Sequence, residues 1–170
     1  MSFYDGFRFP RGVFWLLGAL LLAGCEDSTT ALSYLAVNHT NKSVLSITIN
    51  GQGGILNAPA MGGGGGEVCC VVVPTKWRPG LTATIGWEND GDWLLDKNGQ
   101  PVIRNGKKVY VPAPWKTRTV VIPEYDSDNL GRFHIHFLPN DQVLVKIGNF
   151  NYRKPGYYPP YPDQSKEASQ

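Results

Sequence analysis

The residues best suited to chemistry in this chain are two adjacent cysteines, Cys69 and Cys70. Neighbouring side chains of a regular β-strand point to opposite faces, so that geometry excludes an unstrained disulfide between them. Three states remain: a strained vicinal disulfide in a bulge or turn, two reduced thiols with at least one buried, or pairing with another chain. The simplest interpretation is that residues 68–73 are a core strand in which the cysteines act as small hydrophobic groups. A vicinal disulfide would be easily reduced, so a redox switch is one hypothesis for this pair.

Two of the three histidines, His134 and His136, alternate with Phe133, Ile135 and Phe137. On a β-strand this alternation places both imidazoles on one face and the apolar side chains on the other. Side-by-side imidazoles can bind zinc or copper, but no third ligand is evident nearby. A half-exposed strand with a buried aromatic face explains the same pattern, so we predict no metal site and no cofactor.

Other motifs of enzymes and ligand sites are incomplete. Residues 126–131 begin like a calcium loop, but Phe137 stands at the twelfth position, where such a loop needs an acid. The glycines at 62–66 are not followed by the Gly-Lys-Ser/Thr of a phosphate loop. No serine lies in a Gly-x-Ser-x-Gly elbow. We therefore assign no catalytic residue and expect that the protein is not an enzyme.

The elements that position these residues are short strands separated by turns. Aromatic residues make up 12% of the chain, which also has 20 glycines and 13 prolines. Asn98-Gly99 and Asn105-Gly106 are the positive-φ pairs of tight hairpins, which we expect over 93–103 and 102–111. Strands are expected at 34–38, 44–49, 68–73, 82–87, 109–111, 119–122, 133–138 and 143–147.

This spacing predicts an all-β fold, an antiparallel β-sandwich of about eight short strands, over residues 33–150. Within the strand at 44–49, we expect Leu45, Ile47 and Ile49 to share one face. The segment 151–170 is rich in Tyr and Pro, and we expect it to be a disordered tail with local polyproline character.

The N-terminus predicts the compartment. Arg8 and Arg11 precede an apolar run at 13–22, and the sequence Leu-Ala-Gly-Cys ends at Cys25. This order is typical of a secretory signal peptide, and its ending resembles the bacterial lipobox, whose cysteine is lipidated. We predict a signal peptide over 1–24, then a lipidated Cys25 with a short tether to residue 32. The protein would be anchored by lipid in the cell envelope and face the periplasm. Glu26 after the cysteine resembles the pattern of lipoproteins sorted to the outer membrane, which implies that membrane.

Charge and aromatic residues indicate the kind of partner. The formal net charge is only +2, without the clustered basic face of a nucleic-acid-binding protein, so we expect no nucleic acid partner. Trp and Arg are common anchors of protein interfaces. From their positions at or near strand ends, we select as candidate anchors Trp77, Arg78, Trp93 and Trp115.

The segment 62–87 carries a family resemblance. It contains the glycine run, Cys69-Cys70 and the pattern Pro-x-x-Trp-x-Pro-Gly from Pro74 to Gly80. In these residues the chain resembles a family of small proteobacterial lipoproteins of unknown function that are often encoded near type VI secretion effectors. The resemblance extends loosely over most of 33–150. It implies a periplasmic immunity protein and transfers no catalytic role.

We therefore expect a membrane-anchored periplasmic lipoprotein that binds and neutralises a type VI secretion effector. One alternative is a structural or accessory lipoprotein of a secretion or cell-wall assembly. Another is a redox-responsive envelope sensor that acts through Cys69 and Cys70. Immunity requires a rigid surface that occludes a toxin, and the loops at the ends of a sandwich are natural places for it.

Overall fold

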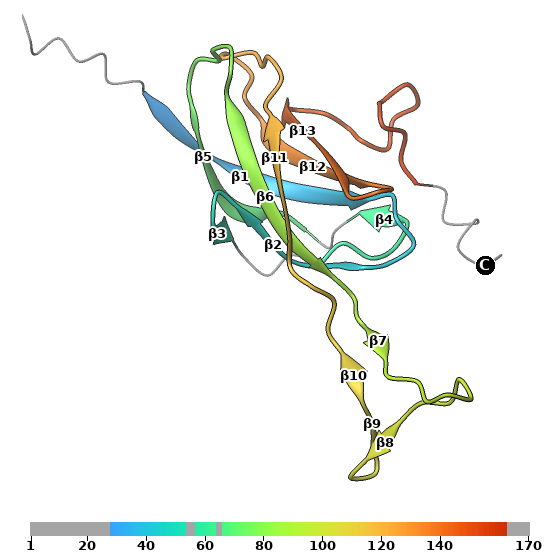
Figure 1. The fold of residues 1–170 in the computed structure, drawn as a ribbon. Coiled ribbons are helices and arrows are strands. Elements are labelled where there is room, and N and C mark those ends of the chain that lie inside the picture. The colour runs from blue at the N-terminus through green and yellow to red at the C-terminus, as the bar shows by residue number, and fades with distance from the viewer. Residues whose placement is uncertain (1–27, 54–56, 64–65, 163–170) are drawn as a thin grey trace, which may run out of the picture.

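The computed structural model describes residues 28–53, 57–63 and 66–162, which form two packed β-sheets and a projecting arm (Figure 1). The predicted signal peptide, the lipidation site Cys25 and the neighbouring Glu26 lie outside the described residues. No helix in the described part of the chain is long and apolar enough to cross a membrane.

The first sheet has the strand order β13-β12-β1-β4, and β5 pairs with the first part of β1. Its strands are β1 (Thr29–Asn38), β4 (Gly62–Gly63), β5 (Val68–Pro74), β12 (Arg132–Leu138) and β13 (Gln142–Gly148). The second sheet has the order β11-β6-β2-β3. Its strands are β2 (Val44–Ile49), β3 (Gln52–Gly53), β6 (Thr82–Asn89) and β11 (Lys116–Val121).

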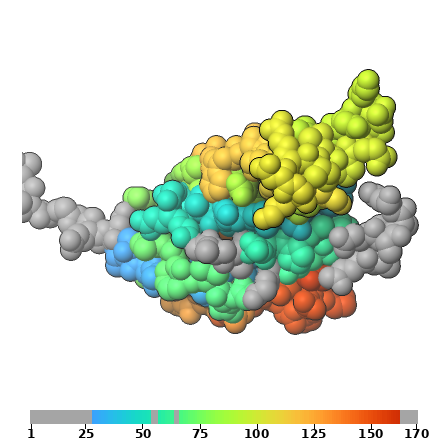
Figure 2. Space-filling model, turned by 90° about the horizontal axis from the view of Figure 1, so that it is seen from below, coloured from blue at the N-terminus to red at the C-terminus, as the bar shows by residue number. Residues whose placement is uncertain are grey.

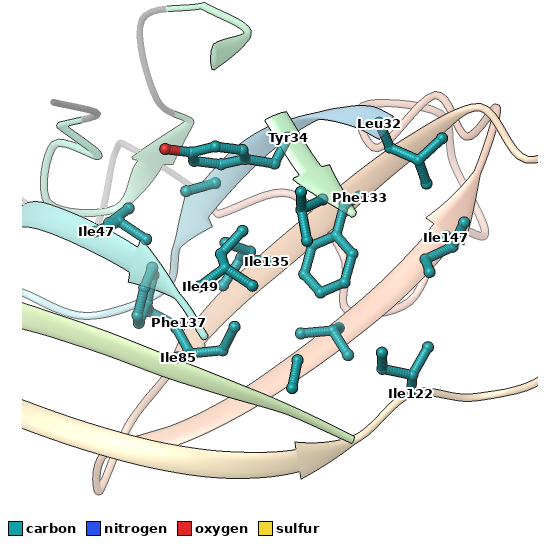
Figure 3. Close-up of a cluster of buried hydrophobic side chains, with 14 of the residues drawn as sticks. Leu32, Tyr34, Ile47, Ile49, Ile85, Ile122, Phe133, Ile135, Phe137 and Ile147 are labelled. Atoms are coloured by element: carbon teal, nitrogen blue, oxygen red, sulfur yellow. The ribbon is translucent and has the colours of Figure 1, made fainter. Parts of the chain in front are cut away.

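The core lies between the inner faces of these sheets (Figure 3). The first sheet contributes Phe133, Ile135 and Phe137 from β12, and alternate residues of β6 reach them from the second sheet. Each large apolar side chain buried here contributes on the order of 2 kcal/mol to stability. The prediction of an all-β sandwich is confirmed, and each of the expected strands is present within a few residues.

Three details differ from the sequence-based expectations. β1 begins at Thr29, so residues 29–32 of the predicted tether are a strand paired with β5. β1 and β12 pair in parallel, because no hairpin joins them and the chain reaches β12 from the other sheet. A bulge in β2 at Ser46 breaks its alternation, so Val44 is fully buried and Leu45 only partly.

The C-terminal segment also differs from its prediction, because residues 151–162 pack against the outer face of the first sheet. The hydroxyl of Tyr161 accepts a hydrogen bond from the Gly63 amide at 2.9 Å. Pro159 and Pro162 are buried. The tyrosines thus give this segment specific polar and apolar contacts, which a disordered tail lacks. Residues 163–170 lie outside the described part.

Candidate functional site

The most prominent feature outside the sandwich is an arm, residues 90–115, that continues from β6 and returns into β11 (Figure 1). In the space-filling view it stands out from the body as a knob (Figure 2). It contains β7 (Asp92–Trp93), β8 (Ile103–Arg104), β9 (Lys107–Lys108) and β10 (Tyr110–Val111). The two predicted hairpins are confirmed: Asn98-Gly99 turns the chain between the bridged residues Leu95 and Pro101, and Asn105-Gly106 joins β8 to β9.

Three cross-strand pairs of the arm contain exposed apolar side chains. Trp93 pairs with Tyr110, Leu95 with Pro101, and Ile103 with Lys108, and paired residues share a face. We use the name arm face for the surface formed by Trp93, Leu95, Ile103 and Tyr110, which are 51%, 53%, 56% and 44% exposed.

Aromatic and cationic contacts order the arm face. The rings of Trp93 and Tyr110 meet edge to face, and the Lys108 ammonium lies 5.8 Å from the centroid of the Trp93 ring. Beyond Trp93, the stretch 96–108 contains one acidic residue, Asp96, and four basic ones, Lys97, Arg104, Lys107 and Lys108. The arm therefore presents an apolar surface with a positively charged tip.

Polar contacts order the root of the arm. The Tyr110 hydroxyl accepts a hydrogen bond from the Gly91 amide at 2.6 Å and donates one to Asp90 Oδ1 at 2.8 Å, so it closes the root from within the arm. Asp92 forms an exposed ion pair of 2.6 Å with Lys42, in the loop that follows β1, which connects the root to the sandwich. An ordered root favours binding because less motion is lost on association.

A polar pocket of about 500 Å³ lies beside the arm root. Trp87 and Phe137 form its apolar floor, and its rim includes His39, Lys42 and Lys116. The Lys116 ammonium already donates hydrogen bonds to Asp141 at 2.7 Å and to Asn89 at 3.1 Å. The pocket thus contains charged groups that are largely paired with each other, and we assign no ligand to it.

A chain of hydrogen bonds runs from this pocket to the C-terminal segment. His39 Nε2 lies 3.1 Å from His136 Nδ1, and His136 Nε2 lies 2.9 Å from the Tyr157 hydroxyl. Burial lowers the pKa of His136 to about 3, lowers that of His39 and raises the pKa of Tyr157 to about 12. All three groups are neutral at pH 7. This series of hydrogen bonds therefore connects the C-terminal segment to the sheet without any charged group.

The two strand histidines do share a face opposite Phe133, Ile135 and Phe137, as predicted, but they are fully buried rather than half-exposed. The C-terminal aromatic residues cover them: Phe150 and Tyr152 lie against His134, and Tyr157 against His136. His134 Nε2–H donates to the Gly148 carbonyl at 3.1 Å. Among the described residues, no group of three or more His, Cys, Asp and Glu side chains is placed to bind a metal ion.

Cys69 and Cys70 form a vicinal disulfide in a bulge of β5. Leu32 pairs with Val71 and Tyr34 with Val68, so the two cysteines lie opposite a single residue of β1. Both cysteines are exposed, and the interpretation that they act as small hydrophobic groups in the core is therefore wrong. The bulge is the reason, because it turns this part of β5 away from the core.

The four predicted anchors are not brought together. Trp93 lies on the arm face, and Trp115 lies half-exposed over Gly86, on the outer side of the second sheet. Trp77 and Arg78 follow β5, at the opposite end of the sandwich from the arm. The Trp77 indole packs against the core and donates a hydrogen bond to the Ile122 carbonyl at 3.1 Å, so its role is structural.

Sequence reasoning did not select three residues of the arm face, Leu95, Ile103 and Tyr110. The available signal was their position in the two predicted hairpins, since paired strands with a shared turn place alternate residues on one surface. Their exposure could not be predicted, because it depends on the absence of any covering element.

Comparison with known proteins shows that most of the chain matches one protein family. A family model described as "Protein of unknown function (DUF3304)" matches residues 37–145, which include the cysteine pair and the whole arm. Neither the curated proteins nor the solved structures contain a match to the chain.

Proposed function

The chain belongs to the DUF3304 family of proteins of unknown function, and we propose that it is a binding protein of the bacterial envelope whose arm face occludes another protein. The partner that we propose is a type VI secretion effector, which this binding neutralises. The protein would be held by lipid on Cys25 and face the periplasm, at the outer membrane.

The observation that carries this proposal is the arm face itself. Most of the large apolar side chains that are exposed in the described residues lie on the arm. Soluble proteins seldom expose such a group on a projecting element unless a partner covers it. Trp and Tyr next to basic side chains are also the residues that dominate binding energy at protein interfaces.

The position of the arm favours a protein partner over the lipid surface. Thr29 begins β1 four residues after Cys25, whereas the arm root contacts the loop after the other end of β1 through Lys42. A strand of ten residues is roughly 33 Å long. A lipid on Cys25 would therefore hold the far end of the sandwich at the membrane, with the arm directed away from it.

The choice of a secretion effector rests on the family resemblance in residues 62–87. Neutralising a toxin requires a rigid surface that covers the toxin's own site, and it requires no catalytic group in the immunity protein. The fixed arm root fits that requirement.

The test is to purify the tagged full-length chain from detergent-solubilised membranes of its source bacterium and identify the co-eluting proteins by mass spectrometry. We expect near-stoichiometric recovery of a secreted effector, lost in Ile103→Ser. Val72→Ser is the matched control, because Val72 is 55% exposed but lies on β5, away from the arm. Recovery of cell-wall or secretion-machine components without an effector would instead favour the accessory role.

One observation favours the redox alternative as a second candidate. Cys69 and Cys70 are both exposed, and exposed disulfides are the ones that thiol reagents and oxidoreductases reach most readily. A sensor would use this pair, whereas an immunity protein would not depend on it.

A further inference from the structure

A second unpartnered apolar surface lies between the free edges of the two sheets. Within the described residues, β11 pairs only with β6 and β13 only with β12, so each has one edge without a strand partner there. A groove of about 490 Å³ lies between them. Its walls are aliphatic, with Val121 67% exposed, and include Val120, Val121, Pro123, Val143 and Leu144.

The two ends of this groove differ in charge. At one end Asp141 ties the strands together, since it accepts hydrogen bonds from Lys116 at 2.7 Å and, through its carbonyl, from Arg118 Nε at 3.2 Å. The other end leads into an exposed loop with three acids and no basic residue between 119 and 131, namely Glu124, Asp126 and Asp128.

One basic residue borders the groove, and its charge is engaged elsewhere. The Lys146 ammonium donates a hydrogen bond to the Tyr158 carbonyl and lies 4.5 Å from the centroid of the Tyr157 ring. At the open end the three acids outnumber Arg78, whose positive charge acts on Tyr125 of the same loop, so this end is net negative. A fitting occupant would have apolar side chains for the walls and a positive end for the loop.

The arm has both of these properties, with its apolar arm face and its basic tip. A molecule's own arm cannot enter its own groove, because it leaves from the Lys116 end of β11 and projects away from the sandwich (Figure 1). We propose that the arm of one copy docks in the β11–β13 groove of a second copy, with its basic tip against the acidic loop 124–128.

This contact joins two different surfaces, so in a pair of copies one keeps a free arm and the other a free groove. Such head-to-tail contacts build rings or open chains of copies rather than a closed two-fold dimer. If the proposed function holds, on which this last step rests, docking also covers the arm face until an effector competes for it.

The first test places a benzophenone cross-linker at Ile103 of the purified full-length chain in detergent. We expect cross-links to peptides of a second, isotopically distinguished copy that contain Val121 or Leu144. A cross-linker at Val72, equally exposed but outside both surfaces, is expected to give none. Cross-links confined to the same copy, or to positions unrelated to the groove, would overturn the proposal.

The second test measures self-association of the purified full-length chain by sedimentation in detergent. Val121→Glu and Glu124→Lys should each weaken it on the order of tenfold, and Val72→Glu should leave it unchanged. Circular dichroism checks that each variant is folded. Self-association equal to that of the original chain in both groove variants, or none in the original chain, would refute the docking. Groove variants leave the arm face intact, so effector binding in them reports separately on the proposed function.

Discussion

Trp93 and Tyr110 face each other across the arm, with ring centroids 5.6 Å apart and ring planes at 72°. The same Tyr110 closes the arm root through its hydroxyl, which contacts Gly91 and Asp90. One side chain thus belongs to the arm face and also closes the root of the arm. Disorder at the root of the arm is therefore expected to disorder the arm face as well.

Gly91→Ala should separate the two strands of the arm root. A Cβ at this position would lie 2.1 Å from the Val111 carbonyl oxygen and 2.8 Å from the Tyr110 ring, so the backbone must shift. We expect faster amide hydrogen exchange over 91–111 and weaker partner binding, with unchanged exchange in β12. Equal protection of the arm in Gly91→Ala and the original chain would contradict a closely packed root.

Acidification should destabilise the fold through its buried histidines. Burial lowers the pKa values of His39, His134 and His136, the last to about 3, whereas the unfolded chain takes up these protons near pH 6.5. Stability is therefore complete above about pH 6.5 and declines as the pH falls towards the folded pKa values. His136 alone should lower the free energy of unfolding by about 2 kcal/mol between pH 7 and pH 5.

Urea denaturation at the two pH values measures this change, with His136→Gln as the comparison. The variant should lose much of the difference between pH 7 and pH 5, whatever its absolute stability. An unchanged pH dependence in His136→Gln would show that His136 is not the group responsible.

Tyr157→Phe should loosen the C-terminal segment. The substitution removes the hydroxyl that lies 2.9 Å from His136 Nε2 and leaves this buried nitrogen without that partner. We expect a loss of about 1–2 kcal/mol in the free energy of unfolding. Tyr158→Phe is the control, because Tyr158 is 67% exposed. Equal losses in the two variants would argue against a specific role for the hydroxyl.

Cys69→Ser and Cys70→Ser separate immunity from redox sensing. Both side chains are exposed and lie on β5, outside the arm. In an immunity protein, each variant should therefore still fold and still bind the partner. A sensor should lose its activity while it remains folded. Protection of cells against the effector, measured in each variant, decides between the two functions.

Local rules predicted much of this fold. The alternation of Phe133, Ile135 and Phe137 defines a buried face, and Asn105-Gly106 defines a hairpin, since both depend only on nearby residues. The burial of His134 and His136 could not be predicted in this way. It depends on aromatic residues of the C-terminal segment that return to the sheet, a contact that no local pattern encodes.

The candidate site was predicted only in part for a similar reason. Trp93 and Trp77 have equally suitable side chains, yet one is exposed on the arm and the other donates its indole N–H to the Ile122 carbonyl. Residue type identifies a side chain that can anchor a partner. The three-dimensional path of the chain determines whether that side chain is buried in the core or exposed to solvent.

The most direct test of the central claim is protection of cells by arm-face variants. The effector recovered with the chain would be produced in the periplasm of cells that carry the original chain, Trp93→Ala, Ile103→Ser or the control Val72→Ser. We expect growth with the original chain and the control, and loss of protection in both arm variants, whose affinity should fall about thirtyfold or more. Full protection by folded Trp93→Ala and Ile103→Ser proteins would contradict binding through the arm face.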